Sequence, residues 1–135
     1  MSGALVDSPL VPVRIHALRG ATTVESDDPT QVDERTQEMM ALLLKRNDLV
    51  ADDLISILFS VTADIRSRNP ATATRAMGIV DVPLLGVQEA DMDSALPLCI
   101  RVMLHIQTET DRSSLHHVFL RGAKVLRPDL VEDDE

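Results

Sequence analysis

Residues 83–108 read PLLGVQEADMDSALPLCIRVMLHIQT, and this stretch decides how the rest of the chain is interpreted. From Cys99 onward, apolar side chains occupy every second position, as expected for a strand with one buried face. Arg101 interrupts this strand between Ile100 and Val102. Because an unpaired charge in a buried sheet costs several kcal/mol, the pattern predicts an anionic partner for Arg101.

Glu89 is the nearest candidate in the sequence for that partner. It follows a second apolar run, residues 82–87, and the turn-rich segment 90–97 could return the chain so that both runs lie in one sheet. Two interpretations are open at this point. The two side chains form a cross-strand ion pair that only stabilises the sheet, or they face a polar ligand.

The chain of 135 residues fits one domain, which we expect over residues 11–130. Residues 1–10 are expected to form a flexible extension, and the acidic residues 131–135 a solvated tail. A domain of this size is small enough to need a neighbouring subunit's surface to complete a site, so we expect an oligomer.

The composition excludes several classes of partner. A formal charge of -9 and an aromatic set limited to Phe59 and Phe119 argue against nucleic acid, which needs basic surface and stacking platforms. No apolar run is long enough to cross a bilayer, and the first residues lack the features of a signal peptide. With one cysteine, Cys99, the chain cannot form an internal disulfide. We therefore expect a cytoplasmic protein without membrane partners.

The periodicity elsewhere predicts an α+β fold with helices on one face of a mixed sheet. We expect strands at 11–18, 54–61, 82–87 and 99–107, and a broken strand or hairpin around Gly122. The turn-forming sequence 19–23 is expected to end the first strand. A long helix should begin at Asp28-Pro29 and end near Asn47, and a short one should run from Pro70 to before Gly78.

A metal site is not expected. His116 and His117 are adjacent, so on a strand their side chains point to opposite faces and cannot bind one ion together. The chain has no second cluster of cysteines or carboxylates with metal-ligand spacing.

Four blocks of sequence carry a resemblance to a known family. They are RGATTVE at 19–25, VQEAD at 87–91, CIRVM at 99–103 and VLRPDL at 125–130. Together they resemble the AroH-class chorismate mutases, and the similarity spans residues 13–130. The resemblance implies conversion of chorismate to prephenate, an intramolecular rearrangement that needs no metal or cofactor. It also implies a ferredoxin-like subunit that assembles as a homotrimer, a pseudo-α/β-barrel with active sites in the clefts between subunits.

The resemblance also implies roles for individual residues. Arg19 matches an arginine that binds a substrate carboxylate, and Arg101 matches one that reaches the ether oxygen and the side-chain carboxylate. Glu89 matches a glutamate that accepts a hydrogen bond from the ring hydroxyl. Further substrate-binding positions are implied at Ala71, Thr72, Arg75, Gly86, Phe119, Leu126 and Arg127.

The chain departs from the family pattern at four positions. Phe119 replaces a common tyrosine, Gly86 a cysteine, Asn69 a phenylalanine and Thr72 a lysine. Because the two main arginines and Glu89 remain, we expect weaker binding or altered turnover rather than lost activity. Two alternatives stay open: a non-catalytic trimeric protein that binds a small carboxylate, and a trimeric deaminase of related architecture.

Overall fold

The computed structural model describes residues 12–132, so the expected extension at 1–10 and the last three residues of the expected tail lie outside the described residues. This described part of the chain contains two α-helices, α1 (Pro29–Arg46) and α2 (Pro70–Ala76). The strands are β1 (Arg14–Thr23), β2 (Leu54–Val61), β3 (Leu84–Gln88), β4 (Cys99–Thr108) and β5 (Val118–Phe119). Short 3-10 turns complete the chain, including one at Arg121–Leu126.

The strands form one mixed sheet in the order β3-β2-β4-β1-β5. The central strand, β4, is antiparallel to both of its neighbours, whereas β2 pairs with β3 and β1 with β5 in parallel. The expected mixed sheet is therefore confirmed. The ferredoxin-like detail is not, because the element order is β-α-β-α-β-β-β, and a ferredoxin-like unit has the order β-α-β-β-α-β.

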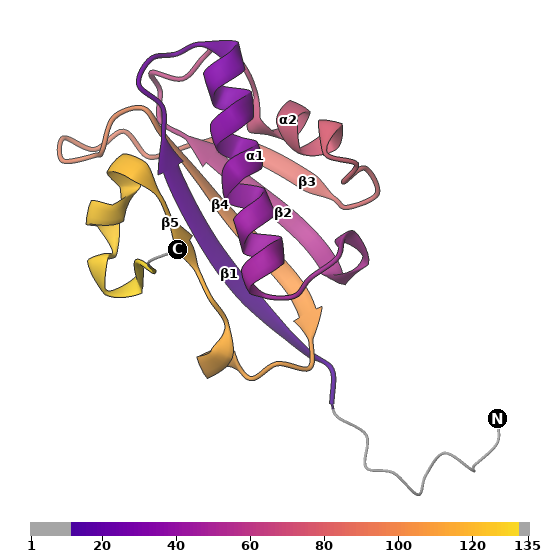
Figure 1. The fold of residues 1–135 in the computed structure, drawn as a ribbon. Coiled ribbons are helices and arrows are strands. Elements are labelled where there is room, and N and C mark those ends of the chain that lie inside the picture. The colour runs from indigo at the N-terminus through magenta and orange to yellow at the C-terminus, as the bar shows by residue number, and fades with distance from the viewer. Residues whose placement is uncertain (1–11, 133–135) are drawn as a thin grey trace, which may run out of the picture.

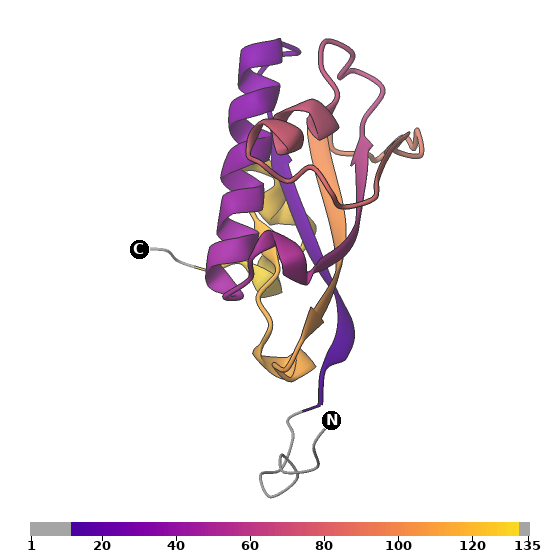
Figure 2. The ribbon, with the colours of Figure 1, turned by 90° about the vertical axis from the view of Figure 1, so that its right-hand side faces the viewer.

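Within residues 12–132, both α-helices cover one face of the sheet, and the other face, here called the uncovered face, has no α-helix. On that face only the 3-10 helix Arg121–Leu126 packs against the sheet, at Ala21 of β1 and Phe119 of β5. Figures 1 and 2 show α1 lying across the strands on that covered face, with α2 beside it near β3. The alternating residues of β4 predicted to share a face are buried there, and α1 contributes its own apolar stripe to the same core. The main core side chains are Leu18, Met39, Leu43, Phe59, Ile100, Val102, Leu104 and Ile106.

Helix α1 begins and ends where the sequence predicts. The Asp28 carboxylate accepts the Gln31 N–H, and Pro29 occupies the first turn, where its missing donor has no consequence. Basic side chains in the last turn complement the helix dipole, and Asn47 caps the end. The short helix and the bounds of β2 are also confirmed.

The prediction that residues 19–23 end the first strand is wrong, because β1 continues through them to Thr23. These residues pair with β4 on one side and with β5 on the other. Gly20 serves close packing rather than a turn. A Cβ atom there would lie 3.0 Å from Leu43 Cδ1 and 3.1 Å from Val102 Cγ1.

The prediction of a broken strand or hairpin around Gly122 is right for the strand before Gly122 and wrong for the residues after it, which belong to a 3-10 helix. Strand β5 pairs with β1 over only two residues, after which the chain turns at Arg121, with φ at 52°, into a 3-10 helix. The Gly122 N–H donates to Thr23 Oγ1 at 3.0 Å, and a Cβ atom at Gly122 would lie 2.9 Å from that oxygen. This close approach requires glycine and holds the C-terminal segment against the end of β1.

The uncovered face of the sheet carries apolar side chains that remain exposed. In β2 and β3 they alternate with residues that face the helices, and Leu58 pairs with Met103 on one side and Leu85 on the other. Leu58 is 38% exposed, Leu85 62% and Val87 44%. The uncovered face is therefore unusually apolar for a solvent-facing sheet.

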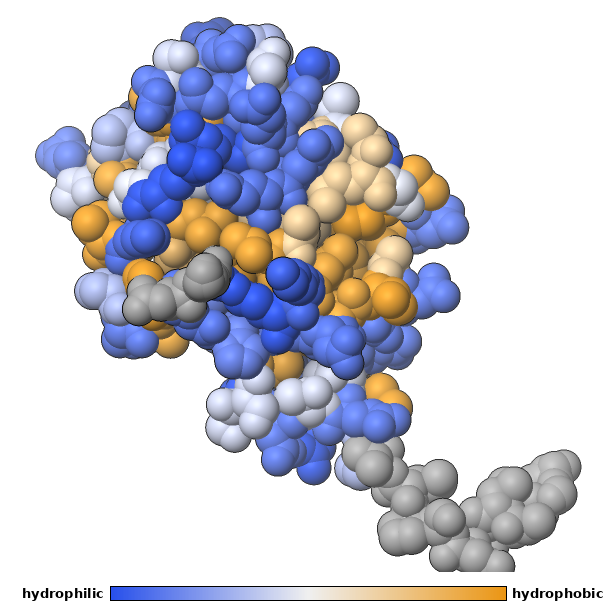
Figure 3. Space-filling model, viewed as in Figure 1, coloured by the Kyte–Doolittle hydropathy of each residue, from blue (hydrophilic) through white to orange (hydrophobic). Residues whose placement is uncertain are grey.

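The helix side of the molecule has a different surface. Figure 3, which views this side, shows hydrophilic surface over much of α1 and apolar surface near α2.

Candidate active site

Arg101 occupies the middle of the uncovered face. Register places Arg101 between Ser60 of β2 and Ala21 of β1. The same row of paired residues across the sheet continues to Val87 of β3 and Phe119 of β5. The Arg101 side chain is partly buried, 27% exposed. The guanidinium group thus belongs to a strand that is paired on both sides, which restrains its backbone.

Glu89 is the partner of Arg101, as predicted. It directly follows β3, where its N–H donates to the Val61 carbonyl at 2.8 Å. Its Oε1 atom lies 3.7 Å from Nε of Arg101 and accepts a hydrogen bond from Ser60 Oγ at 2.6 Å. The two strands do lie in one sheet, but β2 separates them, so the pair spans a strand rather than joining direct neighbours.

The contact between Arg101 and Glu89 is loose. At 3.7 Å it is too long for a hydrogen bond, and Nε of Arg101 has no hydrogen-bond partner among residues 12–132 although the atom is buried. A buried donor without a partner is costly, so it favours an added acceptor. Arg101 is therefore available to a ligand oxygen.

Arg19 shares this location. It pairs with Met103, two residues along β4 from Arg101, and lies on the same face of the sheet. A hollow of about 180 Å³, here called the Arg101 hollow, is lined by Arg19, Leu58, Ser60, Glu89, Arg101, Val102 and Met103. Two cations and one anion thus meet in a small partly apolar space, which suits an anionic organic ligand.

His117, the residue before β5, supports Arg19. Its Nδ1 atom accepts the backbone N–H of Arg19 at 2.9 Å. Burial lowers the pKa of His117, and the positive charges of Arg19 and Arg127 lower it further. The unprotonated ring is the form that can accept this hydrogen bond.

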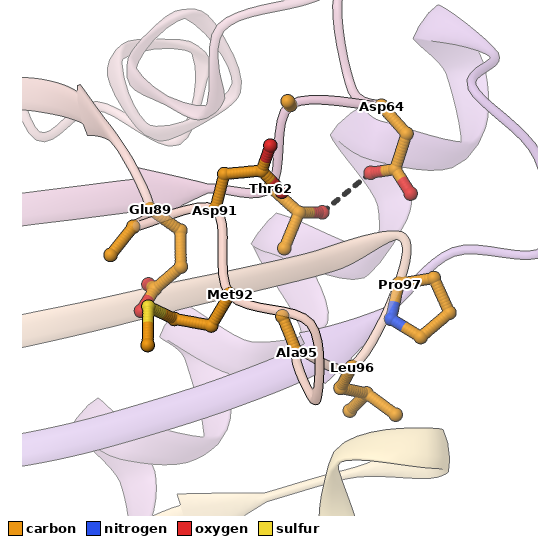
Figure 4. A pocket seen from close by; sticks show the side chains of 10 residues that line it. Thr62, Asp64, Glu89, Asp91, Met92, Ala95, Leu96 and Pro97 are labelled. Atoms are coloured by element: carbon orange, nitrogen blue, oxygen red, sulfur yellow. Dashed lines mark hydrogen bonds between the residues drawn. The ribbon is translucent and has the colours of Figure 1, made fainter.

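A second pocket of about 230 Å³ adjoins the hollow, with Glu89 lining both. Figure 4 shows the segment 90–97 curving around it, opposite Thr62 and Asp64. The Asp64 carboxylate is already engaged, because it accepts the Thr62 hydroxyl at 2.5 Å and the Leu98 N–H at 3.0 Å. Thr62 also accepts the Cys99 N–H at 3.0 Å, so the polar side chains of this pocket hold the start of β4.

One group of predicted site residues lies outside the hollow, around α2 and β3. Gly86 pairs with Phe59, whose side chain is buried under the helices, and a Cβ atom at Gly86 would meet Asn69 Oδ1 at 3.4 Å. Asn69 caps α2 by accepting the Ala71 N–H at 3.0 Å. Members of this group are Ala71, Thr72, Arg75 and Gly86, and a pocket of about 270 Å³ beside them includes Asn69 and Gly86.

Another group borders the hollow from the β5 side. Phe119 is buried against Ala21, Ala123 and Leu126, and Ala21 is the direct neighbour of Arg101 in the sheet. Arg127 is exposed and holds Asp129 through two hydrogen bonds of 3.1 and 2.9 Å. Arg127 must exchange this partner if it is to reach a ligand.

The sequence interpretation missed Ser60 and His117. Ser60 had a weak signal, since it is a polar residue at an alternating position of an apolar strand. His117 had none, because its contact with Arg19 spans 98 positions of the chain. Cys99, next to Arg101, is a packing group: it is buried, and burial raises the pKa of its thiol.

Comparison with known proteins identifies the family. The family model for chorismate mutase type I matches residues 15–130. The chain belongs to the type I chorismate mutase family. The resemblance inferred from the four blocks of sequence is confirmed.

Two relatives named chorismate mutase AroH match over nearly their whole length. The protein of Thermus thermophilus is 38% identical over 117 residues, covering 86% of this chain and 96% of the relative. That of Bacillus subtilis (strain 168) is 37% identical over 117 residues, covering 86% and 92%. A solved structure, a chorismate mutase from Clostridium thermocellum, aligns with a TM-score of 0.80 at 41% identity, covering 82% of this chain and 98% of that chain.

Two further findings concern the described part of this type I chorismate mutase. Between residues 12 and 132, no helix combines the length and the apolar character needed to cross a membrane. Over the same range, no three His, Cys, Asp or Glu side chains gather in a way that could hold a metal ion.

Proposed function

We propose that this protein catalyses the intramolecular rearrangement of chorismate to prephenate in the Arg101 hollow. The observation that carries the proposal is that Arg19 of β1 lines one hollow together with Glu89 and Arg101, which lie 70 or more positions later in the chain. Family membership supports the same reaction and does not favour a non-catalytic carboxylate-binding protein or a deaminase.

Arg101 would act mainly through electrostatics. In this rearrangement the C–O bond breaks ahead of C–C bond formation, so negative charge grows on the ether oxygen in the transition state. A fixed cation beside that oxygen stabilises the transition state more than the ground state. The planar guanidinium group can bind the ether oxygen and a carboxylate together, and its strand holds it in place.

Arg19 and Glu89 would hold the substrate in its reactive shape. Chorismate must be compact, with its two reacting ends close together, and carboxylates held by Arg19 and Arg101 favour that conformation. The Glu89 carboxylate would accept a hydrogen bond from the ring hydroxyl, with Ser60 fixing its position.

We also propose a homotrimer in which each active site combines two subunits. The support is geometric: the Arg101 hollow opens on the uncovered face, whereas Gly86 and α2 belong to the helix side at the β3 edge. One chain cannot bring both groups to a single substrate. Arg75 of one copy would then complete the Arg101 hollow of another.

The exposed apolar side chains of the uncovered face support the assembly. Leu58, Leu85 and Val87 would be buried when the sheets of three subunits pack around a barrel-like axis. Analytical ultracentrifugation tests this directly. A trimer requires three times the chain mass of 14.8 kDa, and a monomer at micromolar concentration would contradict it.

The reaction itself is tested by incubating the purified protein with chorismate. We expect loss of the ultraviolet absorbance of chorismate and formation of prephenate, identified by NMR. Binding without conversion would instead favour the carboxylate-binding alternative. Conversion would place the protein in phenylalanine and tyrosine biosynthesis, and we propose the cytoplasm as its location because its single cysteine, Cys99, is a free buried thiol.

Mixing inactive variants tests whether subunits share a site. Arg101→Lys and Arg75→Ala should each lose activity, but random mixed trimers should contain intact sites at roughly one quarter of the clefts. The matched control mixes Arg101→Lys with Glu89→Gln. Both side chains line the same hollow of one chain, so this mixture should recover no activity. Equal recovery in both mixtures would contradict the shared site.

A further inference from the structure

We propose that His117 is a positioning residue for Arg19. The unprotonated Nδ1 atom of its ring holds the backbone N–H of Arg19 and so fixes the point from which the Arg19 side chain enters the Arg101 hollow. The predicted effect on turnover rests on the proposed function, whereas the contact itself can be tested without turnover.

The register of the sheet shows why a ring nitrogen is needed here. Strands β1 and β5 pair in parallel, with Gly20 opposite Val118 and Ala21 opposite Phe119, and the Leu120 N–H donates to the Ala21 carbonyl at 2.9 Å. If the same hydrogen-bond pattern between β1 and β5 continued two residues toward the N-terminus, the Arg19 N–H would lie opposite the backbone carbonyl of His116. A regular strand would supply that acceptor.

The side chain of Asn47 binds the His116 carbonyl, so this carbonyl is not available to pair with Arg19 of β1. The Asn47 side-chain amide donates to the His116 carbonyl at 2.8 Å, and its Oδ1 atom accepts the His116 N–H at 2.7 Å. Asn47 is buried, 7% exposed, at the end of α1. The end of α1 therefore stops β5 from pairing further, and the His117 ring replaces the missing acceptor. Without it, a partly buried N–H would lack a partner, which is costly.

This contact depends on the protonation state of the imidazole. Nδ1 accepts a hydrogen bond only while the proton of the neutral ring is on Nε2, and protonation places an N–H against the Arg19 N–H. The charged groups that act on the ring are Arg19 on β1, Arg127 in the C-terminal segment and the adjacent His116. His116 in turn contacts Glu132, with its Nδ1 atom 2.6 Å from the carboxylate.

The direction of the pH effect follows from these neighbours. Burial and positive charge hold the pKa of His117 below the ordinary value of 6.5, so the ring stays neutral in neutral solution. As the pH falls below 6.5 and through this lowered pKa, the ring is protonated and the Arg19 contact is lost. The stability that the neutral ring contributes is present above pH 6.5 and is lost over the same acidic range.

NMR of the full-length protein labelled with ¹⁵N tests the contact without requiring turnover. We expect the His117 ring to carry its proton on Nε2 in neutral solution, with an acidic transition below 6.5 that also moves the Arg19 amide signal. A proton on Nδ1 in neutral solution, or an Arg19 amide that does not respond to the transition, would overturn the inference.

Kinetics of three variants test the consequence. His117→Asn presents an amide oxygen near the Nδ1 position and cannot titrate, so we expect neutral-pH activity close to the parent and loss of the acidic decline in kcat/KM. His117→Leu lacks an acceptor and should raise KM, lowering kcat/KM by about tenfold or more. The control His116→Asn removes a neighbouring imidazole whose hydrogen bond is to Glu132, and should keep both activity and acidic decline.

The inference is wrong if His117→Asn is as impaired as His117→Leu, or if it keeps the acidic decline of the parent. If the His117→Leu variant fails to fold, the His117→Asn variant and the NMR titration still test whether His117 positions Arg19. A parent protein without turnover at any pH would refute the proposed function alone, because the NMR titration tests the Arg19 contact separately.

Discussion

Arg101 and Glu89 form their ion pair across an intervening strand, with Ser60 of β2 between them. Ser60 Oγ donates to Glu89 Oε1 at 2.6 Å, and Nε of Arg101 lies 3.7 Å from the same oxygen. The carboxylate is thus held by a neutral hydroxyl, while the guanidinium group keeps a loose contact. This arrangement leaves Arg101 free to exchange its partner for a ligand.

Replacing Arg101 by lysine should nearly abolish catalysis. A lysine ammonium is a point charge that cannot span the ether oxygen and a carboxylate together. By analogy with other preorganised donors, the loss should be roughly 3 to 4 kcal/mol, or at least a few hundredfold in kcat. Stopped-time assays with chorismate measure it, and near-parental turnover would refute the role assigned to Arg101.

Ser60→Ala should raise KM several-fold. Without the hydroxyl, the Glu89 carboxylate is expected to move toward Arg101 and compete with the substrate. Ser60→Thr keeps a hydroxyl and should be less affected. Ser56→Ala is the matched control on the same strand, because its hydroxyl contacts His105 rather than Glu89. Equal kinetic constants in Ser60→Ala and Ser56→Ala would contradict the role of Ser60.

Phe119→Tyr should lower KM if the hydroxyl common in the family contributes to substrate binding. Phe119 is buried, 2% exposed, beside the row that contains Arg101, so a phenol there would need a polar partner. The expected cost is therefore a small loss of stability in the absence of ligand, measured by urea unfolding. Unchanged kinetic constants would show that the hydroxyl is irrelevant in this protein.

Added salt should weaken apparent affinity for chorismate. The substrate is a dianion, and the Arg101 hollow concentrates positive charge in a protein of formal charge -9. Screening reduces that local attraction, so KM should rise with ionic strength while kcat changes little. A KM that is independent of salt would argue that attraction by the arginines does not control binding.

Gly20→Ala should destabilise the fold by about 1 to 3 kcal/mol, because the added methyl group overpacks a full core. It would lie 3.0 Å from Leu43 Cδ1 and 3.1 Å from Val102 Cγ1. Gly86→Ala is the control, since its nearest contact is 3.4 Å, an ordinary separation. Urea denaturation midpoints compare the two, and equal midpoints would show that the core absorbs the methyl group.

Local patterns predicted much of the fold. The alternation in β4 identified its buried face, Asp28 and Pro29 identified the start of α1, and the bounds of β2 were correct. The partner of Arg101 was also predicted, because a charge in an apolar strand needs a nearby opposite charge. These features depend on residues close together in the sequence or on the general cost of burying charge.

The errors occurred where distant segments decide the structure. Gly20 was interpreted as a turn, but side chains of α1 and β4 pack so closely over it that an added Cβ atom would lie within 3.2 Å of Met39 Cγ. Strand β5 is short because the side chain of Asn47, at the end of α1, forms hydrogen bonds with both the N–H and the carbonyl of His116. Nothing in the local sequence reports either contact.

The sequence by itself determined the family, the charged residues and the strand that carries Arg101. Only the tertiary structure decided that Arg19, Glu89 and Arg101 share a hollow, that Ser60 and His117 support it, and that Gly86 and α2 lie elsewhere. The physical reason is that periodicity assigns a residue to a face of its own strand. Strand order and register, which place faces together, are set by packing between segments far apart in the chain.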